Sequence, residues 1–281
     1  MKILFITNAT GIDYLSDCIF HGLVDSGHDV VDSKYLWYLS QPLDIRQKLQ
    51  LYGRGFTISG NLPDRSDVNR SNIHDRILSH EFDRIVYGSI TRCSDYLEEV
   101  RSTYKKNEVI ICNGEDDTNF DMELTKIGLC FKRELTSAQL YPISFAIPEV
   151  KIRRVSPEKT QILSNIIPGT AMQRNYTFTD EKLYYDEYSK SMFGMTMKKA
   201  GWDCLRHYEI IASNCLPYFH NYQACPQFTM MNWPCELQRE SNAMFETNDF
   251  SNYQTVLDEF SRYCIEHLTT KALANYILTK G

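Results

Sequence analysis

The first residues of the chain alternate between a short apolar run and an amphipathic segment. Residues 2–7 centre on an apolar run, which is typical of a strand that is buried on both faces of a sheet. A loop is expected at 8–13, and residues 14–26 carry apolar side chains at helical spacing. Gly27 can end this helix, and a second strand is expected at 29–32. The order strand, helix, strand predicts a βαβ unit and therefore a parallel sheet.

The same alternation resumes after a long irregular excursion at 40–70, which is rich in glycine and proline. One helix is expected inside it at 44–51, and Gly53-Arg54-Gly55-Phe56 is interpreted as a surface turn. The pattern then predicts helices at 72–80 and 94–104 and strands at 84–87, 108–112 and 128–132. Residues 1–148 are therefore predicted to form one doubly wound, Rossmann-like domain.

A second unit of the same class is expected after a charged linker around 151–154. The pattern predicts strands at 161–167, 191–195 and 216–219, helices at 180–189 and 202–213, and closing helices within 250–278. Residues 149–281 are therefore predicted to form a second Rossmann-like domain. Two such domains place a cleft between the carboxyl ends of their sheets, where open α/β sheets bind ligands. The predicted fold class is α/β, with two doubly wound domains facing a cleft.

Composition narrows the classes of function. The chain has 281 residues and a formal net charge of −6, which argues against a large nucleic-acid footprint. Its nine cysteines form no C-x-x-C pair, so we expect reduced thiols and a cytoplasmic protein. No apolar stretch approaches the roughly 18 residues of a membrane span, so none is expected.

Common cofactor signatures are missing from the sequence. The first predicted strand is followed by a loop with a single glycine, and no G-x-G-x-x-G or G-x-x-x-x-G-K-[ST] motif occurs. The sequence therefore gives little support to an NAD-binding site or a P-loop nucleotide site. His207 and His220 lack partners at metal-ligand spacing, so both are interpreted as packing or surface residues.

The segment 198–219 carries the most specific chemistry in the chain. Lys198 and Lys199 precede a predicted helix on which Arg206 and Glu209 are three residues apart and share one face. Cations and the N–H groups of a helix start can hold a diphosphate, and a carboxylate one turn later can hold a ribose. An ordinary surface pair would be worth only about 0.2–0.5 kcal/mol. The opposite face of this helix is apolar, which favours a position at the cleft and predicts a nucleotide-sugar site.

The spacing of these residues resembles the donor-binding segment of GT-B glycosyltransferases. It is most similar to exostosin-like enzymes, in particular those encoded by large algal DNA viruses. The short chain and the segment Phe131-Lys132-Arg133-Glu134 also resemble the xylosyltransferases of chloroviruses. The matching pattern is Lys198-Lys199-x-Gly201-Trp202-Asp203-x-x-Arg206-x-Tyr208-Glu209-Ile210-x-x-x-x-Cys215-x-Pro217.

The resemblance implies an inverting transfer of a sugar from a UDP-linked donor, with UDP-xylose as the best guess, to a glycan or glycoprotein hydroxyl. Glu209 would bind the ribose, and Arg206 with Lys198 or Lys199 would bind the phosphates. Trp202 and Arg133 belong to the matching segments and are expected on the donor side. No cofactor is expected, and metal should be dispensable because fixed cations take its place.

An inverting transfer needs a base that accepts the proton of the acceptor hydroxyl. In a two-domain cleft this base would come from the end of a strand in the first domain. Asp13, after the first strand, is the first candidate, and Asp116, after the strand at 108–112, is the second. Asp13 could equally serve as a helix N-cap, and 115–117 could be a solvated acidic turn.

Three alternatives stay open. Glu115 and Asp117 could bind a divalent cation, as acidic motifs do in GT-A glycosyltransferases. A viral enzyme that glycosylates a modified DNA base is the second alternative, and it would require a basic acceptor groove. The third is a non-catalytic protein that binds nucleotide sugars.

Overall fold

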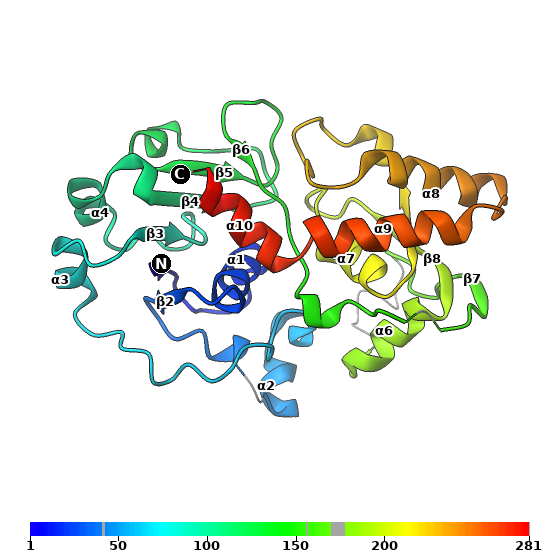
Figure 1. Cartoon of the computed structure of the whole chain (residues 1–281), viewed down its shortest axis with the longest axis horizontal. Coiled ribbons are helices and arrows are strands. Elements are labelled where there is room, and N and C mark those ends of the chain that lie inside the picture. Colours follow the sequence, from blue (N-terminus) through cyan, green and yellow to red (C-terminus); the bar gives the residue numbers. More distant parts are fainter. Residues whose placement is uncertain (41–42, 156, 170–177, 281) are drawn as a thin grey trace.

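The chain folds into two α/β units that lie side by side, each built on a parallel sheet (Figure 1). The structure is a computed structural model that describes residues 1–40, 43–155, 157–169 and 178–280. The predicted α/β class with two Rossmann-like units is confirmed by these sheets.

The first unit contains a six-stranded sheet in the order β2-β1-β3-β4-β5-β6, in which every neighbouring pair is parallel. Its strands are β1 (Lys2–Ile6), β2 (Asp29–Asp32), β3 (Arg84–Tyr87), β4 (Val109–Asn113), β5 (Leu129–Lys132) and β6 (Tyr141–Pro142). The chain order reverses between β1 and β3, so the loops after these two strands flank a topological switch point.

Helices cover both faces of this sheet, as the nearly continuous apolar strands require. Ile3 and Phe5 of β1 pack toward α1 (Tyr14–Asp25) and α10 (Thr270–Thr279). Leu4 and Ile6 point to the other face, toward α3 (Ile73–Leu78) and α4 (Leu97–Thr103). Helix α2 (Ile45–Gln50), in the long segment between β2 and β3, has no buried residue.

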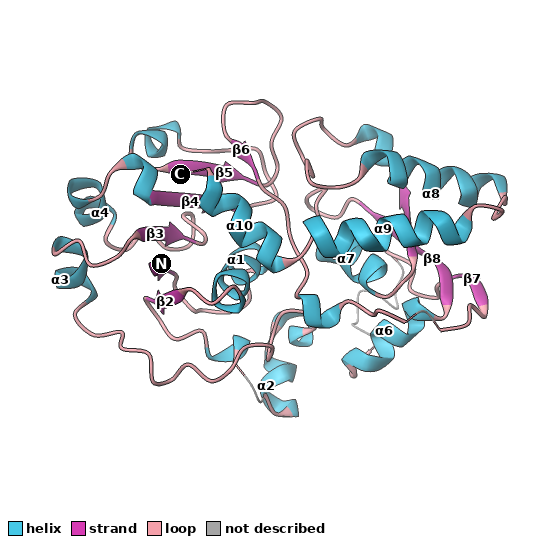
Figure 2. Cartoon of the chain, in the orientation of Figure 1, coloured by secondary structure: helices cyan, strands magenta, loops and turns pink. Residues whose placement is uncertain are grey.

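The second unit has a three-stranded parallel sheet in the order β7-β8-β9 (Figure 2). Its strands are β7 (Gln161–Leu163), β8 (Ser191–Met197) and β9 (Leu216–His220). Its helices are α6 (Glu181–Ser189), α7 (Leu205–Ala212), α8 (Cys235–Thr247) and α9 (Tyr253–His267). Short 3-10 helices occur at Trp37–Leu39, Tyr52–Gly55, Lys106–Glu108, Met122–Lys126, Glu149–Lys151 and Tyr222–Ala224.

The chain crosses between the units twice, and the two crossings are hydrogen-bonded to each other. The Ile147 N–H donates to the Leu268 carbonyl at 2.9 Å, and the Thr270 N–H donates to the Ile147 carbonyl at 2.9 Å. Beyond this point α10, red in Figure 1, packs on α1 of the first unit, where His21 Nδ1 lies 2.9 Å from the Thr270 hydroxyl. The sequence placed all of 149–281 in the second domain, but the contacts of α10 place it on the first.

Local predictions and observed elements differ mainly in length. The helix predicted at 202–213 begins only at Leu205, and the strand predicted at 161–167 ends at Leu163. Helix α8 was not predicted. Asn214 and Gly27 do adopt the positive φ of helix stops, 54° and 79°. Over the residues that the structure describes, no helix is both long and apolar enough to cross a membrane.

Candidate functional site

A pocket of about 370 Å³ lies at the carboxyl ends of β8 and β9. The Lys198 ammonium sits 5.3 Å from the centre of the Trp202 ring, a cation–π arrangement on the pocket wall. An aromatic face beside a cation suits a nucleobase and a phosphate. The residues around the pocket are Met197, Lys198, Trp202, His220, Asn221, Gln223 and Ala224.

A buried histidine holds the loop that carries Trp202. His207 Nε2 lies 2.8 Å from the Trp202 carbonyl, and its Nδ1 lies 2.8 Å from the Thr196 hydroxyl. Burial lowers the pKa of His207 to about 3, so the ring is neutral and donates to the carbonyl while accepting from the hydroxyl. The prediction that His207 is a packing residue agrees with this geometry, whereas His220 lines the pocket.

Arg206 and Glu209 both lie on α7, as predicted, and they interact electrostatically. Within the described part of the chain, no hydrogen bond or ion pair is formed by the half-buried Arg206 guanidinium. Glu209 is only 7% exposed, and burial is the main cause that raises its pKa. Both of its carboxylate oxygens are occupied, Oε1 by the Thr57 hydroxyl and Oε2 by the Tyr184 hydroxyl, each at 2.5 Å.

Lys199 is exposed and faces the first unit. Its ammonium lies 3.4 Å from the Tyr52 hydroxyl, so this lysine reaches across the gap between the units. Tyr52 in turn contacts the ring of Tyr14, which follows Asp13, with ring centres 6.1 Å apart. The loop before α7 therefore approaches the loop after β1.

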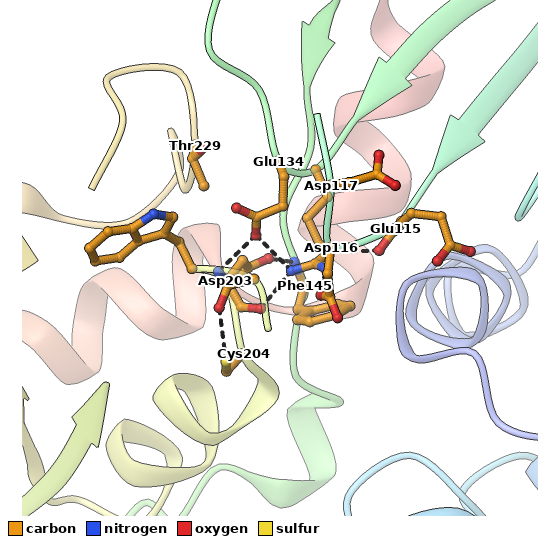
Figure 3. Close-up of polar contacts among 12 residues, drawn as sticks. Glu115, Asp116, Asp117, Glu134, Phe145, Asp203, Cys204 and Thr229 are labelled. Atoms are coloured by element: carbon orange, nitrogen blue, oxygen red, sulfur yellow. Dashed lines mark hydrogen bonds and ion pairs between the residues drawn. The ribbon is translucent and has the colours of Figure 1, made fainter. Parts of the chain in front are cut away.

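The two units meet at a polar cluster that we call the junction, formed by the buried residues Arg133, Glu134 and Asp203 and by the exposed Asp116. The Arg133 guanidinium donates from Nη1 to Glu134 Oε1 at 2.9 Å and to the Asp203 carbonyl at 2.6 Å, and from Nη2 to Asp116 Oδ1. Figure 3 shows Asp116, Glu134 and Asp203 gathered at one point between the units. Gly201 packs so closely here that an added Cβ would lie 2.8 Å from Asp116 Oδ1.

Arg133 was expected to bind the donor, but the structure gives it another task. Its side chain is 1% exposed, its Nε donates to the Gly114 carbonyl at 2.9 Å, and its guanidinium carbon lies 4.7 Å from the centre of the Phe145 ring. The N–H groups of Arg133 that make these contacts point toward other protein atoms. Arg133 therefore joins the units and supports the loop that carries Lys198 and Trp202.

Asp203 in the junction has a carboxyl group that is buried from solvent. Burial, opposed by the Arg133 charge and by the hydrogen bond from the Phe145 N–H at 2.7 Å, raises the pKa of Asp203 to about 6. Its other oxygen accepts from the Tyr208 hydroxyl at 2.9 Å. The carboxyl thus links the first unit at Phe145 to α7 at Tyr208.

Asp13 lies at the carboxyl end of β1 and is the N-cap of α1, since its Oδ1 accepts from the Ser16 N–H at 3.3 Å. Its Oδ2 pairs with Arg92 Nε at 3.2 Å, and the same Nε lies 3.3 Å from Glu115 Oε1. Asp13 also borders a small cavity of about 10 Å³ at the β1–β3 switch point, beside Ser89. The buried side-chain oxygen of Ser89 has no hydrogen-bond partner among the residues that the structure describes.

The acidic turn at 115–117 does not gather its carboxylates around a shared point. Figure 3 shows Glu115 and Asp117 pointing in different directions. Glu115 accepts from the Thr91 hydroxyl at 3.0 Å, and Asp117 accepts from the Asn119 N–H at 2.8 Å. Among the described residues, no group of three or more His, Cys, Asp or Glu side chains could hold a metal ion.

The structure thus brings Lys199 and Asp116 to the contact between the units, and it places Lys198 and Trp202 on the pocket wall of the second unit and Arg206 and Glu209 on α7. Sequence reasoning missed the partners of Glu209, which are Thr57 from the first unit and Tyr184 from α6. The glycines around Thr57 were a usable signal. They were interpreted as a surface turn, but Gly55 is buried and Thr57 is fully covered.

Three solved structures are similar to this chain. An alpha-glucosyltransferase in complex with UDP and a 13-mer DNA containing a HMU base is 10% identical, with a TM-score of 0.45 and 99% of each chain covered. MurG of Acinetobacter baumannii is 11% identical, with a TM-score of 0.42 and 99% of each chain covered. The spinosyn rhamnosyltransferase SpnG, complexed with thymidine diphosphate, is 11% identical, with a TM-score of 0.35 and 99% and 100% of the two chains covered.

No protein-family model and no curated protein matches the chain.

Proposed function

We propose that this protein is a GT-B glycosyltransferase that uses a nucleotide-sugar donor. One observation carries the proposal: Lys198 and Trp202 line the 370 Å³ pocket on a loop whose Gly201 lies so near Asp116 of the other unit that an added Cβ would be 2.8 Å from its Oδ1. A donor held in this pocket would present its sugar to the first unit. The resemblance of the 198–217 segment to exostosin-like enzymes, stated from the sequence, supports the same reading.

The donor site would be divided among three kinds of group. Trp202 offers a face for the base, and Glu209 offers a carboxylate for the ribose hydroxyls. Lys198, Lys199 and Arg206 would surround the diphosphate and stabilise the charge that develops on it as it leaves. We propose a UDP-linked donor, with UDP-xylose as the first candidate from the resemblance. Because three cations supply positive charge, transfer is expected to continue in EDTA.

The reaction would be a single displacement at the anomeric carbon. The acceptor oxygen forms a bond to this carbon while the bond from the carbon to the diphosphate oxygen breaks, and a carboxylate takes the acceptor proton. Asp13 remains the proposed base, because it lies at the carboxyl end of β1 beside a cavity that holds about one oxygen atom. Asp116 is the competing candidate, since it stands against Gly201 of the donor loop.

The proposed acceptor is a hydroxyl of a glycan or glycoprotein. The net charge of −6 weighs against a DNA acceptor, which a basic groove would have to hold. An oligonucleotide with a hydroxymethylated base is nevertheless a useful arm of the test, because its modification would reassign the acceptor without changing the donor site.

A thermal-shift screen of UDP, GDP and TDP sugars, with and without EDTA, tests the donor site. A shift with one nucleotide class that persists in EDTA supports the proposal. Product analysis with the selected donor and glycan acceptors then tests for transfer. Binding with neither transfer nor slow donor hydrolysis would identify a non-catalytic binding protein, and a shift that EDTA abolishes would favour the metal-dependent alternative at Glu115 and Asp117.

A further inference from the structure

Thr57 is a residue of the first unit that is buried among residues of the second. It is 0% exposed, although it belongs to the long excursion between β2 and β3. Its N–H donates to Glu181 Oε1 at 2.6 Å, and its hydroxyl donates to Glu209 Oε1 at 2.5 Å. The Tyr185 hydroxyl lies 2.9 Å from the same threonine oxygen. Thr57 is therefore held against α6 and α7 by three polar contacts.

Each carboxylate oxygen of Glu209 already accepts a hydrogen bond from a hydroxyl of the protein. The Tyr184 hydroxyl donates to Oε2 at 2.5 Å, so an aliphatic hydroxyl and a phenol bind the two carboxylate oxygens. A ribose would bind the same carboxylate through its own aliphatic hydroxyls. The Thr57 hydroxyl is therefore chemically similar to a ribose hydroxyl. It also occupies the position on Glu209 that one ribose hydroxyl of the nucleotide would take.

The backbone of this segment is held in an unusual conformation. Thr57 has φ of 74°, a left-handed value that a β-branched residue rarely adopts. Gly53, Arg54 and Gly55 also have positive φ, at 57°, 58° and 68°. Such conformations persist where surrounding contacts over-determine them, and here those contacts are the bonds to Glu181, Glu209 and Tyr185. Once these bonds are exchanged for bonds to a ligand, the segment loses what holds it inward.

We propose that Thr57 is an internal competitor of the donor, which fills the ribose position on Glu209 until the nucleotide displaces the segment at 53–61. The inference rests on the proposed function, because it takes Glu209 as the ribose ligand. The measured affinity for a nucleotide would then equal the intrinsic affinity multiplied by the fraction of molecules in which Thr57 is withdrawn.

The test compares Thr57→Ala with Thr57→Ser, using UDP as the probe and calorimetry as the measurement. Alanine removes the competing hydroxyl, so UDP should bind about 5- to 10-fold more tightly. Serine keeps the hydroxyl, and its affinity should stay within about 2-fold of the original. Thermal unfolding of each variant verifies that it is folded. Unchanged or weaker binding in folded Thr57→Ala overturns the inference.

The same substitution in a Glu209→Ala background separates competition from an indirect effect. With the carboxylate gone, Thr57→Ala should no longer change UDP affinity; an equal gain in both backgrounds would overturn the competition. UDP binding that needs Glu209 but ignores Thr57 removes only this inference. UDP binding to none of the variants removes the proposed function and the competitor with it.

Hydrogen exchange supplies a readout that does not depend on a variant. In the unmodified protein, saturating UDP should speed exchange of the amides at 56–61, because the Thr57 N–H leaves Glu181. Slower or unchanged exchange of these amides on UDP binding would contradict the displacement.

Discussion

Arg133 of the first unit donates a hydrogen bond to the backbone carbonyl of Asp203 of the second, at 2.6 Å. The Asp203 N–H returns to the first unit, where it donates to Glu134 Oε1 at 3.1 Å. The loop between β8 and α7 is therefore anchored at Asp203, two residues before the helix begins. Since Lys198 and Trp202 lie on this loop, the hydrogen bonds of Arg133 and Glu134 to Asp203 help to position the candidate donor pocket.

Replacing Arg133 should destabilise the protein strongly. Arg133→Gln leaves the buried carboxylate of Glu134 without its cation, and breaking a buried pair by removing one partner costs about 3–5 kcal/mol. Denaturant unfolding measures the difference. Arg239→Gln is the matched control: this arginine is 61% exposed and pairs with Glu236 on α8, so its loss should change the unfolding free energy by under about 1 kcal/mol. Equal costs for the two variants would remove Arg133 from its structural role.

Glu209 should be needed for donor affinity. Glu209→Ala removes the carboxylate proposed to bind the ribose, and the loss of one charge-assisted hydrogen bond, worth about 1.5–3 kcal/mol, corresponds to a loss of about 10- to 100-fold in affinity for UDP. Glu240→Gln on α8, an exposed position, serves as the control and should leave affinity unchanged. Unaltered UDP affinity in folded Glu209→Ala would remove this residue from the site.

Replacing each of the two candidate bases by asparagine distinguishes between them. Asp13→Asn should lower transfer by about 100-fold or more while donor affinity stays nearly constant, because asparagine caps a helix as well as aspartate but accepts no proton at neutral pH. Asp116→Asn keeps the size of the other candidate and tests it in the same assay. Near-normal turnover in Asp13→Asn, with loss in Asp116→Asn, would transfer the role to Asp116.

Asp203 should make stability fall as the pH rises from about 4 to about 6. Its pKa is higher in the folded than in the unfolded state, so the native protein binds more protons in this window, and its contribution is complete below the window and lost above it. Asp203→Asn preserves the shape and removes the titration. The unfolding free energy of the unmodified protein, relative to this variant, should drop by about 2 kcal/mol between pH 4 and pH 7. A constant difference across that range would contradict a raised pKa for Asp203.

Local patterns were enough to predict most elements of the sheets. The strands at 84–87 and 29–32 have the predicted bounds, because apolar runs between turn residues mark buried parallel strands. Helix α8 was not predicted from the sequence because its buried face is polar. Gln238 and Ser241 donate to the Pro217 carbonyl at 2.9 and 2.7 Å, and Asn242 bonds both backbone groups of Phe219. Side chains that satisfy the edge of β9 in this way leave no apolar period to detect.

By itself, the sequence determined the α/β class, the two parallel sheets and the presence of cations and an acid around α7, since these follow from periodicity and spacing along the chain. Only the tertiary structure decided which of these side chains are occupied by contacts within the protein. It turned Arg133 inward to join the units, packed α10 on α1 and covered Glu209 with Thr57, which is 152 residues away along the chain. Such pairings depend on how separate elements pack in space, and no local pattern of residue types records that.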